Sequence, residues 1–238
     1  MPRIFFFMFF LFSCLFSYAQ QIDGVYSLFK KDGSRARNID QATFFIHQTK
    51  ENDTLYVRRL YNKSGPMIKW ESYKDPSCEI PNGIFAWYNE KGTVDSSCRV
   101  VNGAVTDILY FVTGDKTLTK TDPAVADGSS TKAPAPVLVP AEFDGGLKAW
   151  TTYLTKTLET PDRFTRLSKA GTKATVGVSF LISTDGGIYD VFIEKSSEWS
   201  VDMESIRVIK NSPHWKPAVL NGKTVTDNHK QNLTYAVN

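Results

Sequence analysis

The sequence has few side chains suited to metal or acid–base chemistry. Its 238 residues include only three histidines and three cysteines. His47, His214 and His229 form no pair with cysteines or carboxylates at the spacing of metal ligands. There is also no Gly-x-Ser-x-Gly elbow, no P-loop and no dinucleotide-binding glycine motif. The sequence therefore predicts a protein that is not an enzyme and that uses neither a metal nor a cofactor.

A strong charge of either sign is also missing. The net charge is +3, and no basic cluster stands out that could neutralise a row of phosphates. We therefore expect no nucleic-acid partner. The shares of hydrophobic (42%) and charged (22%) residues are those of ordinary globular proteins, so a folded chain is expected.

The N-terminal apolar run is short for a membrane crossing. It extends over residues 4–18, which would make a helix of about 22 Å against a hydrocarbon core of about 30 Å. Arg3 precedes it and Ser17-Tyr18-Ala19 follows as a small-x-small cleavage site, so residues 1–19 are predicted to be a secretory signal peptide. The expected location is the periplasm. The alternatives are an uncleaved signal, which would associate the protein with the membrane, and a lipoprotein at Cys14.

Two cysteines, Cys78 and Cys98, remain after removal of the signal. In an oxidising compartment they are predicted to form a disulfide. Closing a loop of about 21 residues would stabilise the fold by roughly 3 kcal/mol in the chain-entropy model. The alternative is two separately buried free thiols.

Residues 20–121 consist of short aromatic and β-branched runs between glycine-containing turns. An aromatic-x-x-x-Gly pattern recurs at residues 29–33, 61–65 and 88–92, and Asn-Gly pairs occur at 82–83 and 102–103. Such turns predict an antiparallel β-meander, with 84–88 and 108–112 among its strands. The stretch from Tyr61 to Gly114 resembles the MORN-type repeats of the YwqK-like antitoxin family, which implies a packed sheet with a protein-binding surface.

Residues 122–140 are small, polar and rich in proline, which predicts a linker of limited reach. The hydrophobic period then changes from two to 3.6. Leu147, Trp150, Leu154 and Leu158 predict one face of a helix capped by Asp144, and Thr160-Pro161 predicts the start of a second helix.

A strand of clean alternation follows, with Ala174, Val176, Val178, Phe180 and Ile182 on one face. The turn 185–187 predicts an antiparallel return over residues 188–195. A helix capped by Ser200, with Met203, Ile206 and Ile209 as its buried stripe, comes next. Residues 141–238 are therefore predicted to form a two-layer α+β sandwich.

The chain ends with a tryptophan, a hairpin and a final strand. Pro213 should end the helix, Trp215 should anchor the core, and Asn221-Gly222 predicts a type I′ turn. We expect this last strand to lie at a sheet edge, where unpaired backbone groups can bind a partner segment. The predicted partner-binding residues are those of this strand: Gln231, Asn232, Leu233, Thr234, Tyr235, Ala236 and Val237.

This half of the chain resembles the C-terminal domain of TonB, the energy transducer of outer-membrane transport. The resemblance rests on residues 143–146, the 171–180 strand, Asp185-Gly186, residues 212–217 and residues 221–223. It implies a periplasmic domain that binds a TonB-dependent outer-membrane receptor by strand addition, and thus a part in transport across the outer membrane. Thr160-Pro161 departs from the Tyr-Pro pair of many members, and both the apolar run and the linker are shorter than in TonB itself. These departures leave open an alternative function: a periplasmic structural or adaptor protein with two protein-docking domains and no energy-transducing role.

Overall fold

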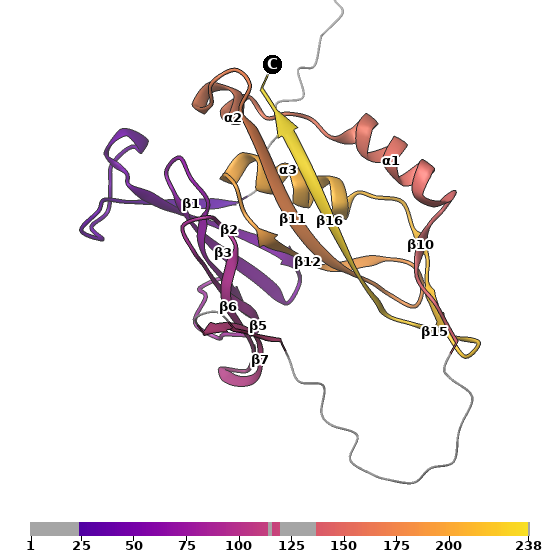
Figure 1. Ribbon diagram of the computed structural model, residues 1–238. Helices are drawn as coiled ribbons and strands as arrows, with labels where there is room; N and C mark the ends of the chain where they lie inside the picture. Colours follow the sequence, from indigo (N-terminus) through magenta and orange to yellow (C-terminus); the bar gives the residue numbers. More distant parts are fainter. Residues whose placement is uncertain (1–23, 114–115, 120–136, 238) are drawn as a thin grey trace, which may run out of the picture.

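The computed structural model describes residues 24–113, 116–119 and 137–237 of the chain (Figure 1). The predicted signal peptide at 1–19 lies outside these residues, as does most of the predicted linker at 122–140. The described residues form an antiparallel sheet followed by a mixed region of helices and small sheets, which confirms the α+β class.

The N-terminal half is one eight-stranded sheet whose spatial order is the order of the sequence. This confirms the predicted meander. Its strands are β1 (Val25–Phe29), β2 (Phe44–Asn52), β3 (Leu55–Asn62), β4 (Met67–Tyr73), β5 (Gly83–Tyr88), β6 (Val94–Val101), β7 (Ala104–Thr113) and β8 (Lys116–Thr119). A 3₁₀ turn, η1 (Ile39–Gln41), lies between β1 and β2. Asn102 and Gly103 join β6 to β7 with φ values of 48° and 85°, the left-handed geometry that a type I′ hairpin requires.

The C-terminal half is built around a three-stranded antiparallel sheet in the order β12-β11-β16. Two small sheets, β10-β13 and β15-β14-β9, flank it, and Asn221 and Gly222 form the predicted turn between β14 and β15. The elements are β9 (Leu138–Val139), β10 (Glu142–Phe143), α1 (Gly146–Thr157), α2 (Asp162–Leu167), β11 (Lys173–Ile182), β12 (Ile188–Lys195), α3 (Trp199–Lys210), β13 (Trp215–Lys216), β14 (Ala218–Leu220), β15 (Lys223–Val225) and β16 (Asp227–Ala236).

Both predicted helix caps are wrong. α1 starts after Gly145, which has φ 83° and makes no side-chain cap, while Asp144 pairs with Lys216 at 3.3 Å. α3 is capped by Glu198, whose carboxylate accepts the backbone N–H of Ser200 at 2.8 Å. A longer acidic side chain two residues upstream thus takes the position predicted for Ser200.

The predicted helical face of α1 is only partly buried. Trp150 is 4% exposed, whereas Leu147 is 79% exposed and Leu158 follows the last helical residue. The helix therefore contacts the core near its middle, through a narrower stripe than the leucine spacing suggests.

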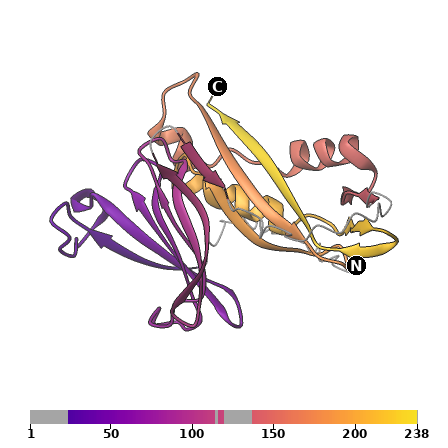
Figure 2. The ribbon, with the colours of Figure 1, turned by 60° about the horizontal axis from the view of Figure 1, so that its bottom comes forward.

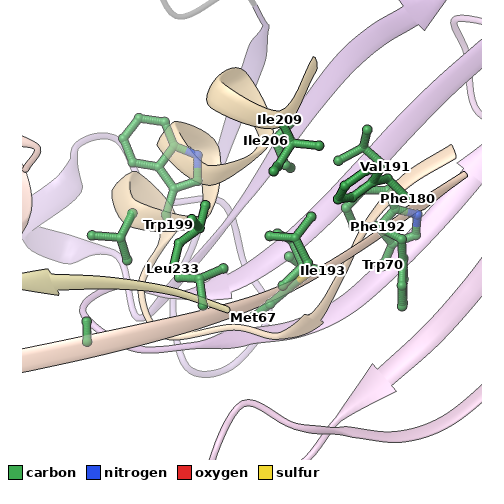
Figure 3. Close-up of a cluster of buried hydrophobic side chains, with 14 of the residues drawn as sticks. Met67, Trp70, Phe180, Val191, Phe192, Ile193, Trp199, Ile206, Ile209 and Leu233 are labelled. Atoms are coloured by element: carbon green, nitrogen blue, oxygen red, sulfur yellow. The ribbon is translucent and has the colours of Figure 1, made fainter. Parts of the chain in front are cut away.

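Helix α3 lies in the core of the whole molecule and not on the surface of one half. Its apolar residues pack on β11 and β12 of the three-stranded sheet, while Trp199 makes edge contacts with Phe45 and His47 of β2. Figure 3 shows this cluster, in which Met67 and Trp70 of β4 approach the same region as Ile193 and Ile206. Polar residues of α3 are buried as well, including Asp202 and Ser205.

Hydrogen bonds join the two halves around this shared core. The hydroxyl of Tyr61 donates to Asp202 Oδ2 at 3.0 Å, and that of Tyr88 donates to the carbonyl of Ile193 at 2.5 Å. The N–H of Met67 donates to Ser196 Oγ at 2.7 Å. In the described part of the chain the two halves therefore share one hydrophobic core. The domain boundaries at 121 and 141 stay a prediction.

Candidate functional site: the free edge of β16

Strand β16 contains most of the predicted partner-binding residues and lies at a sheet edge. It pairs antiparallel with β11 in unbroken register, from Lys173 opposite Ala236 to Ile182 opposite Asp227. Within the residues that the structure describes, no strand pairs with its other side. The strand starts at Asp227, four residues before the predicted start, with only Thr226 between it and β15. Figure 1 shows β16 along the outer side of β11.

The end of the strand fixes which backbone groups point outward. The N–H of Val237 donates to the carbonyl of Thr172 at 3.0 Å, and the carbonyl of Val237 accepts the N–H of Gly171 at 2.7 Å. Backbone groups alternate in direction along an antiparallel strand. Since the register has no shift, the N–H and C=O groups of Asn232, Thr234 and Ala236 point away from β11, toward the open edge.

Side chains hold this strand in place from its inner face. Leu233, Tyr235 and Val237 are buried, while Asn232, Thr234 and Ala236 are exposed on the other face. The hydroxyl oxygens of Tyr235 and Ser205 of α3 lie 2.8 Å apart in a hydrogen bond, and burial raises the pKa of Tyr235 well above its usual value. The strand is therefore anchored by one set of residues and presents its free backbone through the other set.

Gln231 connects the edge strand to helix α1. Its Oε1 accepts the indole N–H of Trp150 at 2.8 Å, and its Nε2 donates to the carbonyl of Asn232 at 2.8 Å. One of the outward carbonyls is thus already satisfied by a side chain. A further donor at Asn232 would share this carbonyl with the Gln231 side chain.

The predicted anchor, Trp215, is buried in an aromatic cluster beneath the start of β16. Its ring lies 5.0 Å from that of Trp150, 5.5 Å from Phe143 and 4.9 Å from His229, and burial lowers the pKa of His229. The turn at Gly186 packs directly on the Trp215 backbone, since a Cβ at Gly186 would lie 2.0 Å from the Trp215 carbonyl oxygen. The Asp-Gly and Pro-His-Trp motifs therefore form one structural unit.

The two cysteines are free thiols in the structure. Both contact a small cluster on the N-terminal sheet that contains Tyr73, Phe85 and Val100, and burial raises the pKa of both thiols. This is the arrangement that the sequence left open as the alternative, although their common cluster brings the two residues into one region. The Cys78–Cys98 disulfide stays a prediction.

Other kinds of site find no support among the described residues. The described residues contain no group of three histidine, cysteine, aspartate or glutamate side chains placed to hold a metal ion. None of the helices within residues 24–113, 116–119 and 137–237 has the length and apolar content of a membrane span.

An extended segment of another chain can add to one anchored, open edge strand on a small α+β domain. Residues 165–237 match the family model described as the Gram-negative bacterial TonB protein C-terminal. Residues 165–237 are therefore similar to the TonB C-terminal domain, and domains of that family are periplasmic and non-catalytic. The match spans less than half of the chain and leaves the MORN-type resemblance of the N-terminal half a prediction. No curated protein and no solved structure matches the chain.

The matched segment contains all of strand β16, but it does not contain every element that supports this strand. The matched segment begins within α2, so α1 and its Trp150 contact lie outside it. Sequence reasoning missed the role of Gln231 as a link to α1, because nothing local to residue 231 indicates a partner 81 positions away.

Proposed function

We propose that this protein is a TonB-like periplasmic protein that binds a segment of an outer-membrane receptor by strand addition on β16, and thereby contributes to transport across the outer membrane. The observation that carries the proposal is the free backbone edge at Asn232, Thr234 and Ala236, on a strand whose inner face is fixed. The TonB-type domain match supports a partner in the Gram-negative envelope. The predicted signal peptide supports the periplasm as the place of action.

Main-chain pairing explains how such an edge could bind without a pocket. Each outward N–H and C=O of β16 can exchange a hydrogen bond with an extended segment, and the exposed side chains between them add contacts. An interaction of this kind depends on the backbone and little on any single side chain. Proline substitution is therefore the sharpest test, because it removes one N–H and nothing else from the ladder.

The experiment compares Thr234→Pro with Thr234→Ala. The Thr234 N–H points away from β11, so proline there leaves the internal ladder intact, and alanine keeps the N–H while removing the side chain. The mature protein would be used to capture proteins from envelope extract, with TonB-dependent receptors quantified by mass spectrometry. We expect receptor recovery to fall by roughly tenfold with proline and to stay within twofold with alanine. Equal recovery with both variants would contradict strand addition.

A structural or adaptor role is the second candidate, and the shared core favours it. The N-terminal sheet is fixed on the C-terminal domain by buried contacts such as Tyr61 with Asp202, which gives one body with two outer surfaces. Deleting the protein distinguishes the two functions. Loss of receptor-dependent nutrient uptake supports the transport function, whereas unchanged uptake with a weakened envelope supports the adaptor.

A further inference from the structure

A groove lies between the two halves of the molecule, away from the free edge of β16. It consists of two adjoining cavities of about 490 and 570 Å³ that share Ile84, Arg99, Asp190 and Phe192. We call these cavities the interdomain groove. One wall comes from the N-terminal sheet, with β5 and β6 in both cavities and β2, β3 and β4 in the second. The other wall comes from β12 in both cavities, from β11 and the start of β16 in the first, and from Lys210 of α3 in the second. Figure 2 shows the two sheets on either side of the molecule.

Two opposite charges in the groove have no partner within the described residues. Arg99 projects from β6 and Asp190 from β12, and neither makes an ion pair within 4.0 Å. Asp107 lies opposite Arg99 in the β6–β7 register, also without an ion pair. The neighbouring charges are neutralised, since Lys230 pairs with Glu194 at 2.7 Å and Lys210 pairs with Glu51.

The backbone at Asp190 is strained. Its φ is 50°, a left-handed value that costs an aspartate roughly 1 kcal/mol or more, and the β11–β12 register shifts at this point. A bulge of this kind turns a side chain out of the regular alternation. Here the residue that carries the strain is also the residue that places a carboxylate in the groove.

Apolar side chains line the groove together with the two charges. Phe192 is buried and Ile84 and Leu181 are partly buried, and all three line the first cavity. The lining of both cavities mixes apolar with polar and charged side chains, and concave sites of several hundred Å³ are the usual size for a small ligand. The charges define its chemistry: the ligand should carry an anion for Arg99 and a cation for Asp190.

We propose that the interdomain groove binds a short zwitterionic peptide, with its carboxylate at Arg99 and its ammonium group at Asp190. A guanidinium can hold a carboxylate through two parallel hydrogen bonds, and Asp190 can accept those of an ammonium group. The peptide's small side chains would then rest on Phe192 and Ile84. This site is separate from the strand-addition site and does not depend on the function proposed for it.

The test uses the full chain and trialanine with free termini, and follows backbone amide shifts of the ¹⁵N-labelled protein by NMR. We expect shifts concentrated at residues 84, 99, 190 and 192. N-acetyl-trialanine amide, which lacks both charges, should bind at least about tenfold more weakly, because each charge-assisted contact contributes a factor of this order. Absence of shifts at about 10 mM trialanine, or equal affinity for the capped peptide, would overturn the proposal.

Matched variants locate the site. Arg99→Gln and Asp190→Asn should each weaken binding of trialanine by roughly tenfold. The second substitution keeps a residue type that tolerates the left-handed backbone, so it should fold normally. Arg37→Gln and Asp95→Asn, at positions outside the groove, should change nothing. Unchanged affinity in both groove variants would refute the assignment, and an unchanged affinity in Thr234→Pro would separate this site from the β16 edge.

Discussion

The three-stranded sheet has two edge strands, β12 and β16, which differ in how far the N-terminal half covers them. At β12, Thr93 bridges to Lys195, the N–H of Ser196 donates to the carbonyl of Gly92 at 2.8 Å, and the Tyr88 hydroxyl donates to the carbonyl of Ile193. At β16, no strand in the described part of the chain occupies the outer side. The C-terminal end of one edge strand is thus covered by the chain itself, whereas the other edge strand is left open.

This difference shows how a domain with two edges can bind a guest strand on one side only. An uncovered edge strand pairs readily with other chains, including copies of itself. Strand addition at β16, as proposed above, would use the edge of this sheet that the N-terminal half does not pair with.

The contacts that cover the end of β12 should weaken as the pH rises, and this is the largest change in stability that we expect. Asp202 is buried beside the end of β12 and accepts from Tyr61, Ser196 and the N–H of Ser197. Burial raises its pKa from 3.8 to about 7, in spite of these donors. Because the folded state holds this proton more tightly than the unfolded state, its stabilising contribution is complete below about pH 4 and is lost as the pH rises to 7.

Over that window the contribution of Asp202 to the free energy of unfolding should fall by up to about 1.4 kcal/mol per pH unit, of order 4 kcal/mol in total. Urea unfolding of the wild type and Asp202→Asn at several pH values measures it. The variant should lose this part of the pH dependence, and amides of residues 193–196 should lose exchange protection first in the wild type. Parallel pH profiles in the two proteins would contradict the assignment.

A side chain at position 92 should disrupt the covered edge of β12 directly, because the backbone of Gly92 lies against that of Ser196. Gly92 has φ 75°, and a Cβ there would lie 2.1 Å from the carbonyl oxygen of Ser196, so Gly92→Ala forces the halves apart. We expect a loss of roughly 3 kcal/mol in unfolding free energy. Gly103→Ala is the control, because its φ of 85° is similar but no atom lies within 4 Å of the added Cβ. It should cost only about 1 kcal/mol, from backbone strain alone. Equal losses would show that contact with Ser196 is unimportant.

Patterns among neighbouring residues were enough to predict most of the helices and strands. The alternation from Ala174 to Ile182 and the Asn221-Gly222 turn report on neighbours within a few residues, and both were confirmed. The edge position of β16 also followed from local reasoning, since a last strand has few chances to be enclosed. Its role as a binding site stays a prediction.

The shared core could not be predicted in the same way. Asp202 and Ser205 occupy positions on α3 that look solvent-exposed in a helical pattern, yet both are buried. They are buried because the second sheet supplies partners from distant segments, such as Tyr61. The hydrophobic pattern of the 12 helical residues does not indicate these distant partners. Asp190 is a similar case, since its left-handed backbone depends on the bulge opposite β11.

A milder change at the covered edge should give an intermediate effect. Tyr88→Phe removes the hydroxyl that donates to the carbonyl of Ile193 while preserving the buried ring. Leaving that carbonyl without its donor should cost about 1–2 kcal/mol in unfolding free energy. Chemical denaturation measures the loss, with Tyr189→Phe as a control at an exposed tyrosine of β12. If the covered edge is as important as we infer, only Tyr88→Phe should also speed amide exchange in β12.

The smallest effect on stability should come from the open edge. Thr234→Pro removes an N–H that points to solvent, so the folded protein loses no internal ladder bond, and the change in unfolding free energy should stay within about 1 kcal/mol. Tyr235→Pro is the comparison one residue along; it removes an N–H that faces β11 together with the buried ring and its hydrogen bond with Ser205, so it should cost more than about 3 kcal/mol, and Tyr235→Ala measures the side-chain part of this loss. Thermal unfolding of the two variants distinguishes the two faces of one strand. A large loss in Thr234→Pro would mean that the outer side of β16 already has a structural partner, and the open edge on which strand addition depends would not exist.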